Sequence, residues 1–194
     1  KNIHLILGYK SEILKDFVNN LSLPFNVKFY LNNQFNKTGC SFSLMKVIPN
    51  LKSNFINVNS DLIISKKSLS ALVCSNKRDI ILVRSLKNKK ESVLQKVQTK
   101  NNKVIRMALT LEKPYDSEAV GPVKISSTAR KKIISIYDRL DQEIKLQIPC
   151  YSLFGVYAQN NPFYTKTIKD NQWIEINDLI DLEKAKTKIN KLNK

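Results

Sequence analysis

Residues 55–64 read Phe-Ile-Asn-Val-Asn-Ser-Asp-Leu-Ile-Ile, an apolar and β-prone run interrupted by one acidic residue, Asp61. The first four residues predict a strand, and the turn-forming residues Asn59 and Ser60 end it. In open α/β sheets, ligands bind in the crevice at the carboxyl ends of the strands. A carboxylate at such a strand end, in a chain of formal net charge +17, predicts a site for a metal ion or a phosphate group.

Strand and helix patterns alternate on both sides of this run, and the helical segments carry apolar residues at a 3.6-residue period. We expect strands at residues 2–7, 27–30, 55–58 and 79–83, with helices between them at 11–21, 43–51 and 67–73. This β-α-β-α-β-α-β order predicts an α/β protein with a Rossmann-like, three-layer α/β/α architecture and a mostly parallel sheet.

The second half of the chain changes character. The segments 93–98 and 103–110 flank a polar turn, which predicts a small antiparallel β-hairpin. Further elements are expected as a strand at 121–125, helices at 128–144 and 151–158, a strand at 173–176, and a closing helix that begins at Asp178. Because no linker rich in proline or glycine divides these elements, we expect residues 1–194 to form one domain.

Length and composition narrow the class of protein. A chain of 194 residues with 42% hydrophobic content is expected to bury a core of its own. No apolar run approaches the roughly 20 residues that span a bilayer, so no membrane span is predicted. The cysteines Cys40, Cys74 and Cys150 are odd in number and lack the spacing of a zinc site. This pattern predicts reduced thiols and a cytoplasmic location.

The excess of basic residues has two interpretations. Lys and Arg total 33 against 16 Asp and Glu, and such a charge attracts polyanions, nucleic acid among them. However, the basic residues occur in every segment without forming one stripe. This distribution favours the interpretation that the charge reflects a lysine-rich composition, which also suits small anionic substrates. A nucleic-acid partner stays as the alternative.

Three segments, in this order, carry a resemblance to a known family. They are the turn Gly8-Tyr9 after the first strand, the strand end Asn59-Ser60-Asp61, and the closing segment 173–185. Together they resemble the nucleotidyltransferases that activate sugar 1-phosphates or phosphocholine, including bacterial phosphocholine cytidylyltransferases. The resemblance implies an Mg²⁺-dependent reaction of a nucleoside triphosphate, with CTP favoured, and a small phosphorylated acceptor. A phosphate of the acceptor attacks the α-phosphate, and pyrophosphate leaves.

The resemblance also implies a metal site. Asp61 matches the family's first metal-binding aspartate, where Mg²⁺ with its preference for carboxylates, phosphates and water would bind. The second metal position matches Asn177, with Asp178 next to it. Two structural alternatives stay open: Asp61 could cap the segment after it, and Asp178 is placed to cap the last helix.

Other matches imply substrate contacts. Thr38, Gly39 and Ser43 match the loop-to-helix segment beside the nucleotide base, and an ordinary helix start is the alternative. Lys113, within Glu-Lys-Pro, matches a catalytic lysine that contacts a phosphate. Glu118 and Gly121 match acceptor-binding residues, and a solvated charge cluster is the alternative.

The family's first strand and its glycine-rich phosphate loop find no match. The chain begins where the family's second strand begins, so a central strand between residues 2–7 and 55–58 is expected to be missing. We therefore expect either an N-terminally truncated enzyme or a degenerate relative that binds without catalysis. A glycosyltransferase of similar fold is a third hypothesis, although the Asp-x-Asp pattern typical of that class is one residue short here. Homo-oligomerisation stays open.

Overall fold

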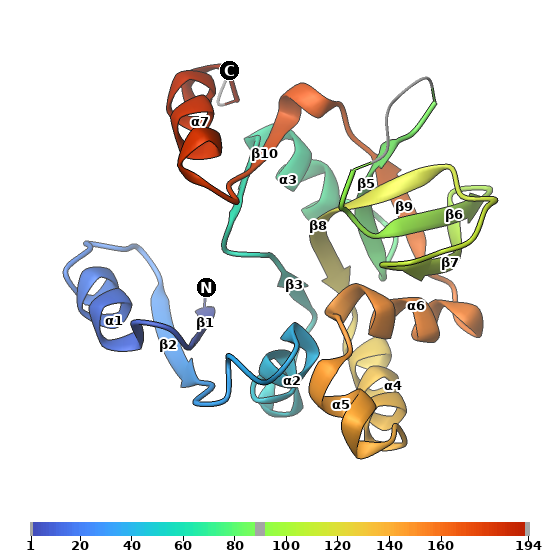
Figure 1. The fold of residues 1–194 in the computed structure, drawn as a ribbon, viewed down its shortest axis with the longest axis horizontal. Coiled ribbons are helices and arrows are strands. Elements are labelled where there is room, and N and C mark those ends of the chain that lie inside the picture. The colour runs from blue at the N-terminus through green and yellow to red at the C-terminus, as the bar shows by residue number, and fades with distance from the viewer. Residues whose placement is uncertain (1, 88–91, 193–194) are drawn as a thin grey trace.

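The computed structural model describes residues 2–87 and 92–192, and in these a six-stranded sheet lies at the centre of the fold (Figure 1). Its spatial order is β3-β8-β5-β9-β7-β6. The strands are β3 (Phe55–Asn57), β5 (Ile80–Ser85), β6 (Lys96–Lys100), β7 (Lys103–Ala108), β8 (Ser117–Ile125) and β9 (Tyr164–Thr167). Two smaller sheets complete the described strands: β1 (Asn2–Leu7) pairs with β2 (Asn26–Leu31), and β4 (Leu62–Ile64) pairs with β10 (Trp173–Glu175).

The helices follow the strands in the alternating order that the sequence predicts for the first half. They are α1 (Ser11–Asn19), α2 (Cys40–Met45), α3 (Lys66–Val73), α4 (Ser127–Asp138), α5 (Gln142–Gln147), α6 (Cys150–Gln159) and α7 (Leu179–Leu192). None of the helices within the described residues has the length and hydropathy that a membrane span requires.

The α/β class is confirmed, but the predicted mostly parallel sheet is wrong. β8 pairs antiparallel with β3, β5 and β6, and among the described strand pairings of this sheet only that of β5 with β9 is parallel. The reason lies in the pairing partners: β8 comes from the second half of the chain and inserts between β3 and β5. The order of strands in the sequence is therefore not their order in space.

Several elements differ in extent from the prediction. The hairpin is confirmed as β6–β7, and its turn places Asn101 and Asn102 at φ 52° and 58°, as a two-residue hairpin turn requires. The long helix expected at 128–144 divides into α4 and α5, because Asp141 adopts an extended conformation between them. The strands β4 and β9 are short and were not predicted.

Both faces of the central sheet are buried. Along β5, Ile81 and Val83 join the larger core with α4 and α6, whereas Ile80 and Leu82 join a second core under α3. This alternation is what a strand with helices on both faces requires. Figure 1 shows α3 on one side of the sheet and α4 and α6 on the other. The three layers thus exist around a mixed sheet.

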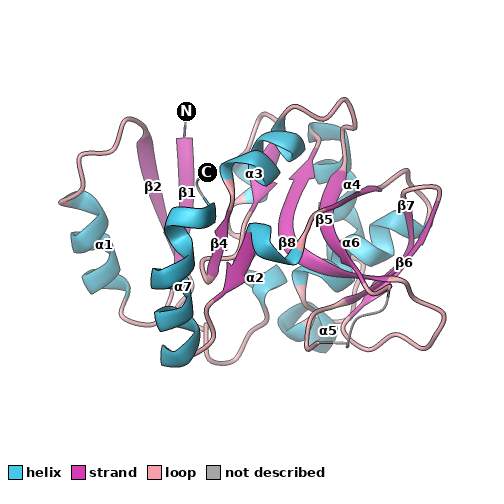
Figure 2. Ribbon diagram, turned by 90° about the horizontal axis from the view of Figure 1, so that it is seen from above, coloured by secondary structure: helices cyan, strands magenta, loops and turns pink. Residues whose placement is uncertain are grey.

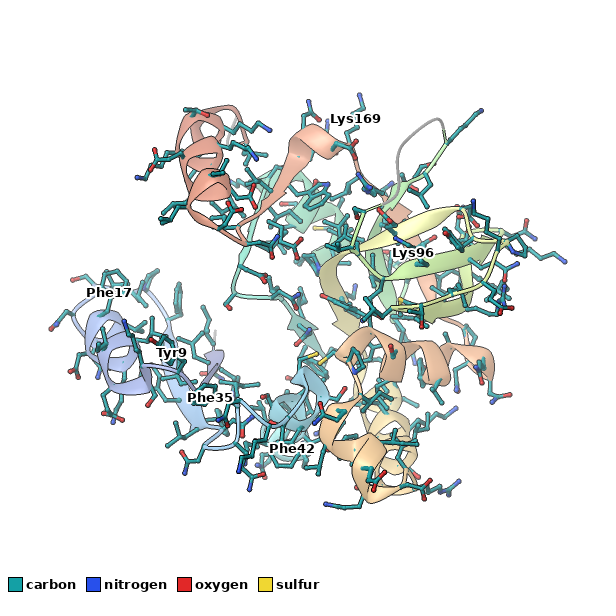
Figure 3. The ribbon with its side chains drawn as sticks, viewed as in Figure 1. Tyr9, Phe17, Phe35, Phe42, Lys96 and Lys169 are labelled. Carbon is teal, nitrogen blue, oxygen red and sulfur yellow. The ribbon has the colours of Figure 1, made fainter. Side chains whose placement is uncertain are left out.

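The unit formed by β1, α1 and β2 lies at one end of the molecule, and the β6–β7 hairpin lies at the other (Figure 2). The helix predicted from the apolar period forms, but its apolar side chains face solvent: Ile13 is 63% exposed and Phe17 is 62% exposed. Figure 3 labels Phe17 and Tyr9 in this unit and Phe35 in the loop after β2, where the ring centroids of Tyr9 and Phe35 lie 6.1 Å apart. β1 and β3 belong to different sheets, and no strand in the described part of the chain pairs with both.

Candidate functional site

The strand end that carries Asp61 lies beside β10. β4 and β10 are antiparallel, with Leu62 opposite Glu175, and the N–H of Ile176 donates to the carbonyl oxygen of Asp61 at 2.8 Å. Asn177 therefore follows directly on the residue that is bonded to Asp61. The fold brings together the two positions that the sequence proposes as metal ligands, although Asp61 and Ile176 are 115 positions apart in the chain.

The carboxylate of Asp61 is partly enclosed and incompletely bonded. Its Oδ1 is buried, and within the described residues it has no hydrogen-bond partner. Leaving a buried polar group unpaired costs about 1–3 kcal/mol, and more for a charged group. The neighbouring Asn177 is exposed. A cation at Asp61 would satisfy the buried oxygen, so the residues present fit a magnesium ion.

Asp178 has a structural role. It precedes the first residue of α7, and its Oδ1 accepts the N–H of Asp181 at 2.8 Å. This is the hydrogen bond of a helix N-cap, so the capping role that the sequence predicts for Asp178 is confirmed. Its proposed contribution to a metal site depends on its second carboxylate oxygen.

Tyr151 contacts the strand end that carries Asp61, through Asn59, and it was not predicted as a site residue. The residue is 8% exposed, and its hydroxyl lies within hydrogen-bond distance of two acceptors that share its single proton, Oδ1 of Asn59 at 3.0 Å and the carbonyl oxygen of Gly121 at 2.9 Å. Burial raises its pKa, and the electrostatic effects of the nearby ionisable groups Cys150, Cys40, Asp61 and Glu175 raise it further.

Glu175 is a second missed residue. Its charge acts on Tyr151 together with that of Asp61, and its Oε2 accepts the side-chain N–H of Asn177 at 3.4 Å. Glu175 is the last residue of β10, and Asn177 follows two positions later in the chain. A shallow pocket of about 270 Å³ is lined by both residues and by Trp173, Lys184 and Lys188.

Gly121 is needed for its backbone conformation. It adopts φ +140°, in a region that L side chains rarely occupy, and a Cβ there would lie 3.1 Å from Cδ2 of Leu62 and 3.4 Å from the hydroxyl oxygen of Tyr151. Gly121 thereby lets β8 pass close to β4 and expose a carbonyl to Tyr151.

Replacing Gly121 by alanine is expected to lower the free energy of unfolding by about 1–3 kcal/mol, because the positive φ strains any L side chain. Urea denaturation of the wild type and of Gly121→Ala measures this difference. An unchanged transition midpoint would contradict the strain.

The residues proposed to contact the nucleotide are gathered by Asn32, which is 1% exposed. Its Nδ2 donates to Oγ1 of Thr38 at 3.0 Å and to Oγ of Ser43 at 2.9 Å. Gly39 lies against α5, where its N–H donates to the carbonyl oxygen of Leu146 at 2.6 Å. Asn32 was not predicted, and it gives this loop a defined shape.

Glu118 lies in a buried ion cluster on β8. Its side chain is fully buried and forms ion pairs with Arg84 and Lys96, both at 2.5 Å, while Ser92 donates to it from the backbone N–H and the hydroxyl at 2.8 Å. Lys113 lies in the loop between β7 and β8, with its Nζ 5.9 Å from the ring centroid of Tyr115. Glu118 therefore has an evident structural role, and its proposed acceptor contact stays a prediction.

Few side chains near Asp61 could act as ligands of a metal ion. Within residues 2–87 and 92–192, no three His, Cys, Asp or Glu side chains gather as a metal-binding group. One or two carboxylates are what Mg²⁺ takes from a protein when phosphates and water complete its coordination. A metal at this site would therefore depend on a bound phosphate compound.

No protein-family model matches the chain, and no curated protein sequence matches it. Solved structures do match. The inositol-1-phosphate CTP transferase from T. maritima superposes with a TM-score of 0.76 at 15% identity, over 98% of this chain and 76% of that one. For UDP-glucose pyrophosphorylase in complex with UDP-glucose the TM-score is 0.74 at 11% identity, over 98% and 81% of the two chains.

The CTP:phosphocholine cytidylyltransferase from Streptococcus pneumoniae superposes with a TM-score of 0.65 at 14% identity, over 97% of this chain and 78% of that one. The agreement extends over nearly all of the chain in each case, although few residues are identical. The chain therefore has the fold of the sugar-phosphate nucleotidyltransferases and cytidylyltransferases.

Proposed function

We propose that the chain is the nucleotidyltransferase domain of an Mg²⁺-dependent enzyme. It transfers a nucleotidyl group from a nucleoside triphosphate, with CTP favoured, to a sugar phosphate or phosphocholine and releases pyrophosphate. The observation that carries the proposal is the buried, unpartnered Oδ1 of Asp61, held beside Asn177 by β4 and β10 in a fold shared with such enzymes.

The reaction needs little covalent help from the protein, because phosphoryl transfer depends mainly on positioning and on neutralising charge. A phosphate oxygen of the acceptor attacks the α-phosphorus, and the bond from that phosphorus to the bridging oxygen of pyrophosphate breaks. Mg²⁺ bound at Asp61 would neutralise negative charge on the phosphates. Asn177 would add a neutral carbonyl oxygen, and Asp178 its uncapped oxygen.

The other proposed roles concern binding. Thr38, Gly39 and Ser43, in the loop shaped by Asn32, would contact the base. Lys113 would contact a phosphate, and Gly121 would present its backbone to the acceptor. The net charge of +17 favours anionic substrates of this kind. A cytoplasmic location and self-association stay predictions.

Asn177 supports a second candidate function. An amide at the second metal position supplies no negative charge, which would weaken a site that has few carboxylates. The chain would then bind a nucleotide without turning it over.

Calorimetric titration of the protein with CTP, UTP, GTP and dTTP, with and without Mg²⁺, tests nucleotide binding, which both candidate functions require. Pyrophosphate release in the presence of sugar 1-phosphates or phosphocholine separates them. Mg²⁺-dependent binding with release supports the enzyme, and binding without release supports the second candidate. Absence of Mg²⁺-dependent binding for all four nucleotides would overturn both.

A further inference from the structure

Two cysteines that are 110 residues apart in the sequence meet in the fold. Cys40 is the first residue of α2, Cys150 is the first residue of α6, and the two helices pack against each other. The backbone N–H of Cys150 donates to Sγ of Cys40 at 2.9 Å, so the thiol of Cys40 lies directly against Cys150. The pair is thus in place before any covalent bond forms.

The two cysteines differ in how exposed the residues are. Cys40 is exposed, whereas Cys150 is 4% exposed. The hydrogen bond from the Cys150 side chain, opposed in part by burial and supported by backbone N–H groups, lowers the pKa of Cys40 to about 6. That same hydrogen bond and burial raise the pKa of Cys150. An accessible thiolate with a protonated thiol against it is the arrangement of oxidation-sensitive cysteine pairs.

We propose that Cys40 is a site of oxidation by hydrogen peroxide and that Cys150 converts the oxidised residue into a Cys40–Cys150 disulfide. In the first step the Cys40 thiolate attacks one peroxide oxygen; an S–O bond forms, the O–O bond breaks, and hydroxide leaves. The sulfur is oxidised to sulfenic acid, and the peroxide is reduced.

In the second step the Cys150 sulfur attacks the Cys40 sulfur. The S–S bond forms, the S–O bond breaks, and the departing hydroxide takes the Cys150 proton as water. The disulfide would join α2 to α6, next to the loop of Thr38 and Ser43 and next to Tyr151. The chemistry requires neither nucleotide nor metal, so it stands whether or not the proposed transferase activity does.

The disulfide is tested on a Cys74→Ser chain, which removes the remaining thiol, treated with about one equivalent of hydrogen peroxide. Non-reducing peptide mass mapping is expected to find the peptides of Cys40 and Cys150 linked, and dithiothreitol is expected to separate them. In the Cys150→Ser variant, dimedone is expected to trap Cys40 as its sulfenic acid. In the Cys40→Ser variant, Cys150 is expected to stay reduced, because it is buried. Circular dichroism verifies that each variant is folded.

Alkylation rates provide an independent readout. At pH 6, iodoacetamide is expected to modify Cys40 in the folded chain about tenfold faster than the same cysteine in an unstructured peptide of the flanking sequence. A lower pKa raises the fraction of Cys40 that is thiolate but makes that thiolate less nucleophilic, and the tenfold increase is the net result of the two effects. Equal rates, or peroxide treatment that leaves both cysteines reduced, would overturn the proposal. Oxidation of Cys40 to sulfinic acid while Cys150 stays free would overturn it as well.

Discussion

Pyrophosphate release is expected to fall by about two to three orders of magnitude when Asp61 is replaced by asparagine, because a loss of about 3–4 kcal/mol of transition-state stabilisation has that effect. The amide keeps the shape of the side chain but removes the charge that would hold Mg²⁺. The free energy of unfolding is expected to rise in the same variant, since Oδ1 of Asp61 is buried without a partner in the described structure. A neutral group at that position is less costly to bury than a carboxylate.

The two readouts distinguish a metal ligand from a structural carboxylate. Steady-state kinetics and urea denaturation are measured on the wild type, on Asp61→Asn and on a matched control, Asp16→Asn, which changes an exposed aspartate of α1. The control should retain both activity and stability. If Asp61→Asn instead unfolds at lower urea concentration and keeps its turnover per folded molecule, the carboxylate serves the fold rather than a metal.

Replacing Glu118 by alanine is expected to lower the free energy of unfolding by about 3–5 kcal/mol, the usual cost of breaking a buried ion pair from one side. The substitution leaves Arg84 and Lys96 with most of their side chains covered, 13% and 11% exposed, but without the carboxylate that joins them. Figure 3 shows Lys96 within the central sheet.

Urea denaturation measures the loss, with Glu112→Ala as the matched control because Glu112 is an exposed glutamate in the nearby loop. That control is expected to stay within about 0.5 kcal/mol of the wild type. A small effect of Glu118→Ala would mean that water enters and solvates the two cations.

The same cluster predicts a pH dependence of stability. Burial by itself would raise the pKa of Glu118, but the hydrogen bonds from Lys96, Ser92 and Arg84 outweigh it and hold the pKa below its usual value of 4.5. The unfolded chain therefore takes up this proton at higher pH than the folded chain does. The stabilising contribution is fully present above pH 4.5 and is lost as the pH falls through the folded-state pKa. Urea titrations between neutral and acidic pH should show a shallower decline for Glu118→Gln.

Local patterns predicted much of the fold. The strand at residues 2–7 forms at the predicted positions as β1, and α1 begins at the predicted Ser11, because periodicity and turn residues act over a few neighbours. Pairing was not predictable in this way. The position of β8 between β3 and β5 depends on contacts between residues that are tens of positions apart, and a single sequence does not encode those contacts in any local pattern.

The candidate site likewise contains residues that the sequence could predict and residues that it could not. Asp61 was recognisable from its own strand end, and its position beside Asn177 agrees with the order of motifs. Tyr151 was not recognisable, because a tyrosine in an apolar helix has the pattern of a core residue until the fold places it against Asn59 and Gly121. Glu175 was missed for a similar reason, since its proximity to Tyr151 depends on the pairing of β4 with β10.

The position of β8 also sets an order of events on the ribosome. β3 is complete at residue 57 and β5 at residue 85, yet β3 has β8 as its pairing partner, and β5 pairs with β8 and β9. A nascent chain must therefore extend past residue 125, and clear the exit tunnel, before these apolar strands can be joined in one sheet. Until then both edges of Ile80–Ser85 lack their strand partners, because β8 and β9 come later in the chain, and pairing between such distant segments forms more slowly than local helices do.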